Sequence, residues 1–159
     1  MSEAKDAHSK ETVGCCLRST TLTRAGIKIG FIGIAEREWI DLFKDLEENI
    51  IYQNYKRSAS EEAKVLREKE GCEYVIALTH MRIAHDKKLA CEVPGVDLVL
   101  GGHDHEYHCH ANEHSRKDEA QGPHVQNKTV PLVKSGTDFL DMTEIDITFG
   151  VKENQFKVF

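Results

Sequence analysis

Apolar residues in the middle of the chain come in three short, continuous runs. Each run contains β-branched residues and has the length of a strand that is covered on both faces. The runs are IKIGFIGIA at residues 27–35, YVIAL at residues 74–78 and VDLVL at residues 96–100. The pattern therefore predicts three buried strands, of the kind that form the centre of a parallel sheet.

Stretches with helical periodicity separate these runs. Residues 36–50 carry apolar side chains at spacings of three and four, and Trp39 falls on that face, which favours a core position for it. Residues 59–70 predict a second helix with Ser58 as its N-cap, and a shorter helix is expected at residues 87–92. The alternation of strands and helices predicts an α/β fold with right-handed crossovers.

The pattern changes toward both ends of the chain. Residues 1–11 are polar and charged and are expected to form a disordered lead-in, so the domain is assigned to residues 12–159. Residues 103–128 are polar and rich in histidine, which predicts a long loop. Further strands are expected at residues 13–24, 130–134, 142–149 and 155–158. Within residues 142–149 the apolar side chains alternate as in a half-buried antiparallel strand.

Composition narrows the functional classes. The chain has 159 residues, of which 40% are apolar and 30% charged, so one domain with its own core is expected. The formal charge of −6 disfavours binding to nucleic-acid polymers. No apolar run has the ~20 residues of a membrane span, and the start of the sequence is not that of a signal peptide, which favours a cytoplasmic location. The five cysteines lack CxxC spacing and are interpreted mostly as buried thiols.

Two of the three apolar runs end in histidine. YVIAL leads into Thr-His-Met-Arg, which contains His80, and VDLVL leads into Gly-Gly-His-Asp-His, which contains His103 and His105. The carboxyl ends of parallel strands meet at one edge of a sheet, and ligands bind there. We therefore predict that these three histidines bind metal. Neutral imidazoles suit Zn, Mn, Fe or Co better than Ca or Mg.

These segments also carry a family resemblance. From about Gly26 to Phe149 the chain resembles the calcineurin-like metallophosphoesterases, and within them the 5′-nucleotidase branch. The matching segments are GIKIGFIGIAEREWID, YVIALTHMR, GVDLVLGGHDHEYH and VPLVKSGTDFLDMTEIDITF. The resemblance implies a partial metallophosphoesterase-type βα sandwich, in which parallel strands with helices are followed by antiparallel strands.

The resemblance also implies a two-metal site. It assigns His80 and His103 to one divalent ion and His105 to the other. The implied activity is hydrolysis of a phosphoester, possibly a nucleotide, by a hydroxide that the metals activate. Asp104 is a candidate for orienting a neighbouring histidine, and Arg82 either orients a phosphate or pairs with an acidic neighbour.

Other histidines in the region have two interpretations. His108, His110 and His114 form either a second zinc site or part of a polar surface, and the second reading is favoured. His85 stands where members of the resembling family often carry asparagine, and it receives no role.

Part of the family's signature is missing. The Asp-x-His, Gly-Asp and Gly-Asn-His motifs of the N-terminal half do not occur in the sequence, so the chain corresponds to the second half of the catalytic domain. The missing half could be encoded in the same gene or supplied by another chain. The alternative function is a catalytically incomplete metal-binding or interaction module. A half-built sheet should also leave an exposed edge and an uncovered apolar face.

Overall fold

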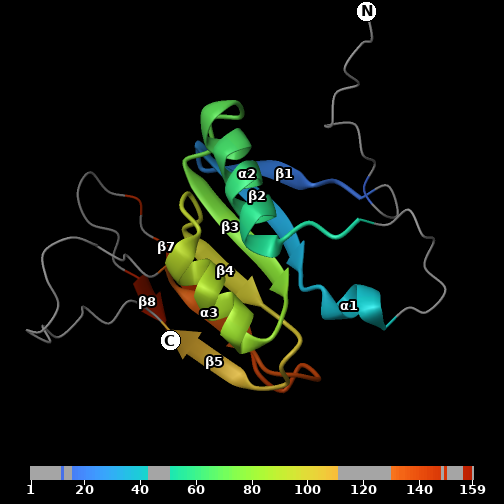
Figure 1. Ribbon diagram of the computed structural model, residues 1–159. Helices are drawn as coiled ribbons and strands as arrows, with labels where there is room; N and C mark the ends of the chain where they lie inside the picture. The colour runs from blue at the N-terminus through green and yellow to red at the C-terminus, as the bar shows by residue number, and fades with distance from the viewer. Residues whose placement is uncertain are drawn as a thin grey trace, which may run out of the picture.

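The computed structural model describes residues 12, 16–42, 51–110, 130–147 and 149, and the backbone of residues 156–158. Over these residues the chain forms a six-stranded sheet with helices and a small two-stranded sheet (Figure 1). The elements in chain order are β1 (Ser19–Arg24), β2 (Ile27–Ala35), α1 (Glu38–Asp41), α2 (Tyr55–Glu68), β3 (Tyr74–His80), α3 (Ile83–Glu92), β4 (Leu98–Gly101), β5 (Tyr107–His110), β6 (Leu132–Ser135), β7 (Ile145–Ile147) and β8 (Phe156–Val158).

The larger sheet is parallel in its centre and antiparallel at its edges. Its strand order is β1-β2-β3-β4-β6-β5, and the pairs β2–β3, β3–β4 and β4–β6 are parallel. The edge strands β1 and β5 each run antiparallel to their neighbour. The predicted α/β class is therefore confirmed, and so is the parallel centre formed by the three apolar runs.

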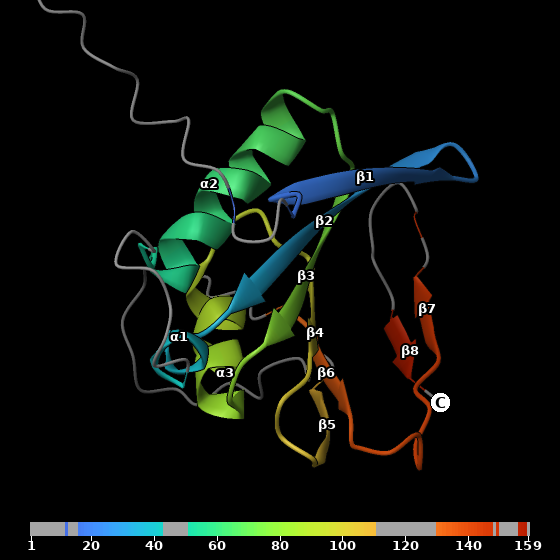
Figure 2. The same cartoon turned by 90° about the vertical axis from the view of Figure 1, so that its right-hand side faces the viewer.

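Helices α2 and α3 cover one face of this sheet (Figure 2). Alternate residues of the strands point into the core beneath them, and Ile32, Val75 and Val99 are completely buried there. Ala59 and Ala63 of α2 are also completely buried, because their small side chains let the helix approach the strands closely. This face holds most of the buried apolar surface that stabilises the described part of the chain.

Strands β7 and β8 lie on the opposite face (Figure 2). Ile145 and Ile147 of β7 pack there against Tyr74, Ile76 and Leu98 of the sheet. Nearer the carboxyl ends of the strands this face is more open, and Leu78 is 45% exposed. The apolar face is thus covered at one end and partly exposed at the other.

The helices begin at positions that the sequence pattern did not indicate. The helix predicted from residue 36 is the single turn α1, and residues 43–50 lie outside the described part of the chain. Helix α2 begins four residues earlier than expected, because the Asn54 side chain, rather than Ser58, accepts hydrogen bonds from the first backbone N–H groups. Helix α3 also begins earlier, at Ile83.

Two further expectations need correction. Residues 107–110, predicted to lie in a loop, form the edge strand β5, which pairs with β6 through its backbone and so needs no apolar side chains. Among the described cysteines only Cys72 is buried, so the interpretation of most cysteines as buried thiols is wrong. The expected strand at 13–24 is shorter and begins at Ser19.

Several predictions fall on residues that the structure does not describe. They include the lead-in at residues 1–11, the loop beyond residue 110 and His114. The domain assignment of residues 12–159 stays a prediction. No helix in the described ranges is both long and apolar enough to cross a membrane.

Candidate metal centre at the carboxyl edge of the sheet

The two predicted histidine segments meet at one edge of the sheet. His80 is the last residue of β3, and His103 follows the end of the neighbouring strand β4 by two residues. Their imidazole centroids are 5.5 Å apart, with an angle of 62° between the ring planes. The parallel pairing, in which Thr79 lies opposite Gly101, produces this proximity. We call His80 and His103 the histidine pair.

The backbone between β4 and His103 is tightly constrained. Gly102 donates a 2.8 Å hydrogen bond to the carbonyl of Thr79, which holds the loop against β3. A Cβ atom on Gly102 would lie 3.3 Å from Nδ1 of His80, so a glycine gives that imidazole room. His103 has a φ of 77°, an uncommon conformation for a residue with a side chain. The loop thus places the second imidazole close to the first through a strained turn.

A buried lysine joins the two histidine loops. Lys134 of β6 is 1% exposed, and its Nζ donates hydrogen bonds to the carbonyls of Met81 (2.7 Å) and Gly102 (2.8 Å). These carbonyls belong to the residue after His80 and the residue before His103. The ammonium also lies 2.8 Å from Oδ2 of Asp86 and 2.6 Å from Oδ2 of Asp104. Four oxygens around one buried charge therefore fix the spacing of the loops.

The pKa values of the two carboxylates around Lys134 are shifted in opposite directions. Burial raises the pKa of Asp86, although the hydrogen bonds from Lys134 and from the Thr79 hydroxyl (2.6 Å) oppose that rise. For Asp104, burial also acts to raise the pKa, but the hydrogen bonds from Lys134 and from the backbone N–H of Ile83 lower it overall. Asp104 is therefore held as a carboxylate between Lys134 and the start of α3, and the neighbouring His103 also acts to lower its pKa.

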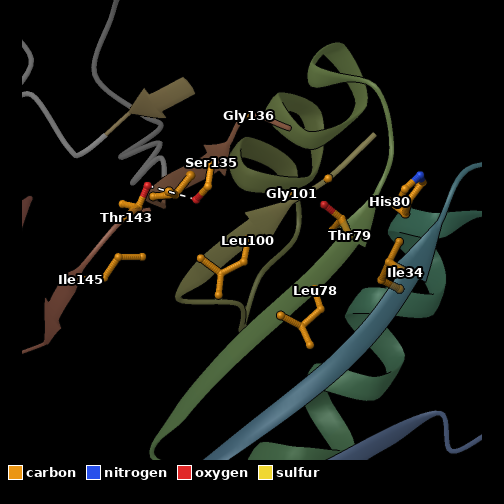
Figure 3. Close-up of a pocket in the computed structure, with 12 residues that line it drawn as sticks. Ile34, Leu78, Thr79, His80, Leu100, Gly101, Ser135, Gly136, Thr143 and Ile145 are labelled. Carbon is orange, nitrogen blue, oxygen red and sulfur yellow. Dashed lines mark hydrogen bonds between the residues drawn. The ribbon is translucent and has the colours of Figure 1, made fainter. Parts of the chain in front are cut away.

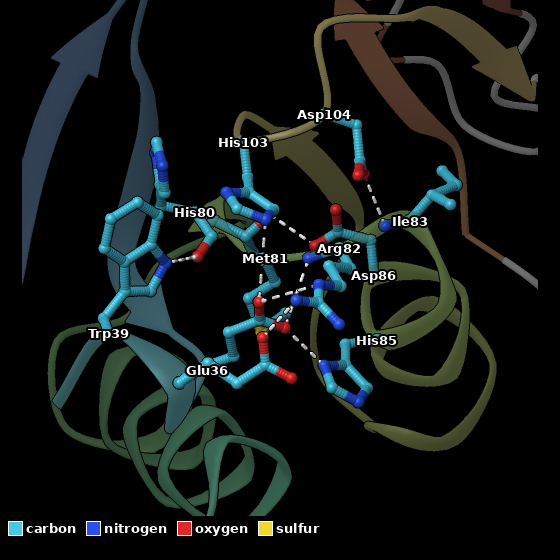
Figure 4. A network of polar contacts seen from close by, with 12 residues as sticks. Glu36, Trp39, His80, Met81, Arg82, Ile83, His85, Asp86, His103 and Asp104 are labelled. Atoms are coloured by element: carbon cyan, nitrogen blue, oxygen red, sulfur yellow. Dashed lines mark hydrogen bonds and ion pairs between the residues drawn. The ribbon is translucent and has the colours of Figure 1, made fainter. Parts of the chain in front are cut away.

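A third carboxylate, that of Glu36, lies close to His103 of the histidine pair. Glu36, directly after β2, is only 2% exposed, and its Oε2 lies 2.5 Å from Nδ1 of His85 and accepts from the backbone N–H of Arg82 (3.2 Å). Its Oε1 lies 3.9 Å from Nε2 of His103 and has no hydrogen-bond partner among the residues that the structure describes (Figure 4). Burial alone would raise the pKa of Glu36, but the bonds from His85 and Arg82 outweigh it and lower that pKa.

Trp39 packs against the histidine pair instead of the core. Its ring centroid is 4.6 Å from that of His80 and 5.2 Å from that of His103, and its Nε1 donates a 3.0 Å hydrogen bond to the carbonyl of His80. The expectation that Trp39 belongs to the core was therefore wrong. The apolar spacing at residues 36–50 could not reveal this, because the short helix α1 presents Trp39 to the edge of the sheet (Figure 4).

The remaining candidate residues lie around this pair. Arg82 is half-exposed and pairs with Glu38, and its Nε is 3.9 Å from Oε1 of Glu36. Of the two roles predicted for Arg82, the structure thus shows the pairing with acidic neighbours. His105 is exposed. His108 is partly buried on β5 and burial lowers its pKa, whereas His110 is exposed.

The donor groups fit part of a transition-metal site. Two imidazoles at contact distance and a buried carboxylate oxygen without a partner are suitable donors for Zn, Mn, Fe or Co. Among the residues that the structure describes, however, no three His, Cys, Asp or Glu side chains are grouped closely enough to enclose an ion. His80 and His103 lie together, and His105 is not grouped with them. The three metal assignments stay predictions.

An open hollow of about 520 Å³ adjoins His80 on the face that β7 covers (Figure 3). Its apolar wall includes Leu78, Leu100 and Ile145, and its polar side includes Ser135, whose hydroxyl donates a 3.0 Å hydrogen bond to Thr143. The hollow therefore offers a small molecule a space with one imidazole at its margin.

Known proteins resemble this chain in sequence over short parts of their length. No family model matches it. An apyrase of Tabanus yao is 31% identical over 91 residues, which are 57% of this chain and 16% of the apyrase. A 5′-nucleotidase of Diplobatis ommata is 28% identical over 129 residues, or 77% of this chain and 22% of that protein. The chain thus spans about a fifth of the length of these relatives.

Solved structures show the same fold. The NAD nucleotidase of Haemophilus influenzae has a TM-score of 0.67 at 14% identity, covering 89% of this chain and 29% of that protein. A calcineurin-like phosphoesterase of Bacillus subtilis has a TM-score of 0.55 at 22% identity, covering 83% of this chain and 42% of that protein. The sheet and its helices thus have the calcineurin-like phosphoesterase fold. Within that class, the chain is homologous to a segment of 5′-nucleotidases and apyrases, which confirms the resemblance inferred from its sequence.

Proposed function

We propose that this chain contributes part of the active site of a metal-dependent phosphoester hydrolase of the nucleotidase type. The observation that carries the proposal is the proximity of His80 and His103, whose ring centroids are 5.5 Å apart at the carboxyl edge of the sheet. The named activities of the relatives, a 5′-nucleotidase and an apyrase, support a nucleotide or a related phosphoester as the substrate.

In this proposal the histidines hold the metals and the surrounding residues keep them in place. His80 and His103 would share one divalent ion, and His105 would face a second. When bound, such ions polarise the phosphoryl oxygens and lower the pKa of a water so that it can attack phosphorus. Lys134 keeps the two histidine loops at a fixed spacing. Arg82 would bind a phosphate through its exposed guanidinium, and its ion pair with Glu38 would then be partly broken.

The alternative is a metal-binding or interaction module without turnover. It is favoured by the lack of a closed cluster of three ligands among the described side chains. The two functions differ in a simple measurement. The hydrolase requires release of phosphate, whereas the module requires at most one ion per chain and no turnover.

The experiment compares the chain with two histidine variants, using Mn²⁺ or Zn²⁺ and either AMP or a generic phosphate monoester. If the reading frame continues upstream of Met1, the longer protein is assayed in the same way. We expect metal-dependent phosphate release that falls at least about 100-fold in His103→Asn, because an imidazole ligand is lost. His110→Asn, which changes an exposed histidine on β5, is the matched control and should retain the activity.

Two results would contradict the hydrolase proposal. Turnover that persists after chelation of the metal would exclude the mechanism. Loss of turnover in both variants would show that the histidine pair has no special role. Two tightly bound ions per chain would count against the module.

A further inference from the structure

Glu36 is a buried carboxylate whose hydrogen bonding is incomplete. It follows the last residue of β2, and it is 2% exposed. Removing a carboxylate from water is costly unless both oxygens find partners. One oxygen of Glu36 has them, because Oε2 contacts Nδ1 of His85 and the backbone N–H of Arg82. The other oxygen, Oε1, is buried but accepts no hydrogen bond from the described part of the chain.

The unpartnered oxygen points toward the histidine pair. Oε1 is 3.9 Å from Nε2 of His103, and Figure 4 shows the carboxylate below that imidazole. Trp39 packs against both histidine rings (5.2 Å to His103), so the ring of His103 has the indole on one side and the carboxylate near one nitrogen. Oε1 is equally far, 3.9 Å, from Nε of Arg82.

A structural role explains only one of the two oxygens. Oε2 binds the N-terminal end of the α3 segment through Arg82 and His85, which would be sufficient to anchor β2 to that segment. A structural role does not explain why the second oxygen is buried beside His103 without a hydrogen bond from the described residues. Imidazole ligands of metals commonly donate their other ring N–H to a carboxylate, which orients the ring and makes it a stronger ligand.

We propose that Glu36 is a positioning residue of the metal centre, whose Oε1 accepts the Nε2 proton of His103 and leaves the other ring nitrogen for the ion. The inference rests on the proposed function in assigning a metal to the histidine pair. It places a negative charge from this chain beside a site whose predicted ligands are all histidines. The sequence could not indicate this, because a single glutamate after an apolar run has no distinctive spacing.

The test is a titration of the metal-free chain with Co²⁺. Calorimetry measures the affinity, and the visible absorption of the bound ion reports on its ligands. Glu36→Gln keeps the shape of the side chain and removes its charge. Glu38→Gln is the matched control, because it makes the same change two residues away at a half-exposed position that also pairs with Arg82. His103→Ala and His80→Ala identify binding at the histidine pair.

We expect Co²⁺ affinity to fall about 10- to 100-fold in Glu36→Gln and less than about 2-fold in Glu38→Gln. The Co²⁺ absorption of Glu36→Gln should also change, because the orientation of an imidazole ligand changes. Thermal unfolding of the metal-free variants shows whether they fold. If Glu36→Gln does not fold, Glu36→Asp replaces it, since it keeps the charge but withdraws it from His103, and a smaller loss in the same direction is expected.

Three results would overturn the inference. They are unchanged affinity in the Glu36 variant, equal losses in the Glu36 and Glu38 variants, and Co²⁺ binding that is absent or independent of His103. Each outcome is separate from the phosphate-release assay. Hydrolysis with no effect of Glu36 would leave the proposed function intact, while Glu36-dependent binding without hydrolysis would support the inference and favour the module.

Discussion

Lys134 is the residue on which the geometry of the two histidine loops depends most directly. Its ammonium is buried and contacts two carbonyls and two carboxylates. In Lys134→Met the completely buried Asp86 would stay in place without its cation, so we expect the free energy of unfolding to fall by about 3–5 kcal/mol. Urea denaturation measures the change.

The control for this prediction is Lys56→Met. Lys56 also pairs with a carboxylate, Glu92 at 2.7 Å, but the two side chains are 38% and 50% exposed, far more than Lys134. Exposed ion pairs contribute little to stability, so its unfolding midpoint should hardly change. Equal losses in the two variants would mean that burial of Lys134 has no particular importance.

Tyr74 is a buried residue whose hydroxyl forms no hydrogen bond with the described residues. Its ring lies in the core on the β7 side, it is 2% exposed, and burial raises the pKa of its hydroxyl above the ordinary value near 10. Tyr74→Phe removes the unsatisfied group, so we expect stability at neutral pH to stay the same or rise by about 1 kcal/mol. A loss of more than that would show that the hydroxyl has a partner.

The same substitution predicts a dependence on pH. The pKa of Tyr74 is higher in the folded chain than in the unfolded chain, so folding favours the neutral hydroxyl. The resulting contribution to stability is fully present at a pH below the unfolded pKa. It is lost as the pH rises through the unfolded value toward the folded one. Above about pH 10 the native chain should therefore lose stability faster than Tyr74→Phe. Chemical denaturation at pH 8 and at pH 10.5 checks the difference.

At the scale of elements, α2 gives a direct test of where a helix begins. Asn54 accepts hydrogen bonds from the N–H groups of Lys56 (3.0 Å) and Arg57 (3.3 Å). Asn54→Ala should cost about 1 kcal/mol of stability, whereas Ser58→Ala, which changes a residue inside the helix, should cost much less. Thermal unfolding of the two variants compares them. A larger loss in the Ser58 variant would restore the boundary predicted from the sequence.

The sequence predicted best those elements that consist of one uninterrupted run of apolar residues. Strand β2 has the predicted bounds, residues 27–35, because its apolar run ends in charged residues on one side and a glycine turn on the other. Strand β5 was missed because it is an edge strand held by backbone hydrogen bonds to β6, with half-exposed or exposed side chains. The start of α2 was missed because Asn54 precedes residues without an obvious apolar period.

At the scale of the whole molecule, the position of the candidate site was predictable but its supporting groups were not. His80 and His103 end neighbouring apolar runs, and parallel pairing brings such ends together. Lys134 reads in the sequence as the polar end of a strand, and Glu36 as the polar start of a helix. Their burial depends on tertiary contacts with β4, α3 and His103, which no local pattern encodes.

The two faces of the sheet differ in how closely they are covered in the described structure. The helix-covered face contains the larger apolar core, and the other face carries β7 and the hollow beside His80. The partly exposed apolar surface that the sequence predicted is found on this second face, where Leu78 lines the hollow. The site therefore stands between a well-packed layer and a more open one.

The alternation of side chains along β3 limits how the sequence of this strand can evolve. Val75 and Ala77 point to the helices, while Tyr74 and Ile76 point to the other face, which His80 also faces at the margin of the hollow. Inserting or deleting one codon between Tyr74 and His80 would turn the imidazole to the helix side, and two codons would move it by about 7 Å along the strand. The number of residues between Tyr74 and His80 is thus fixed by the position of the imidazole as well as by packing. We therefore expect homologous chains to differ here by substitutions and not by insertions or deletions.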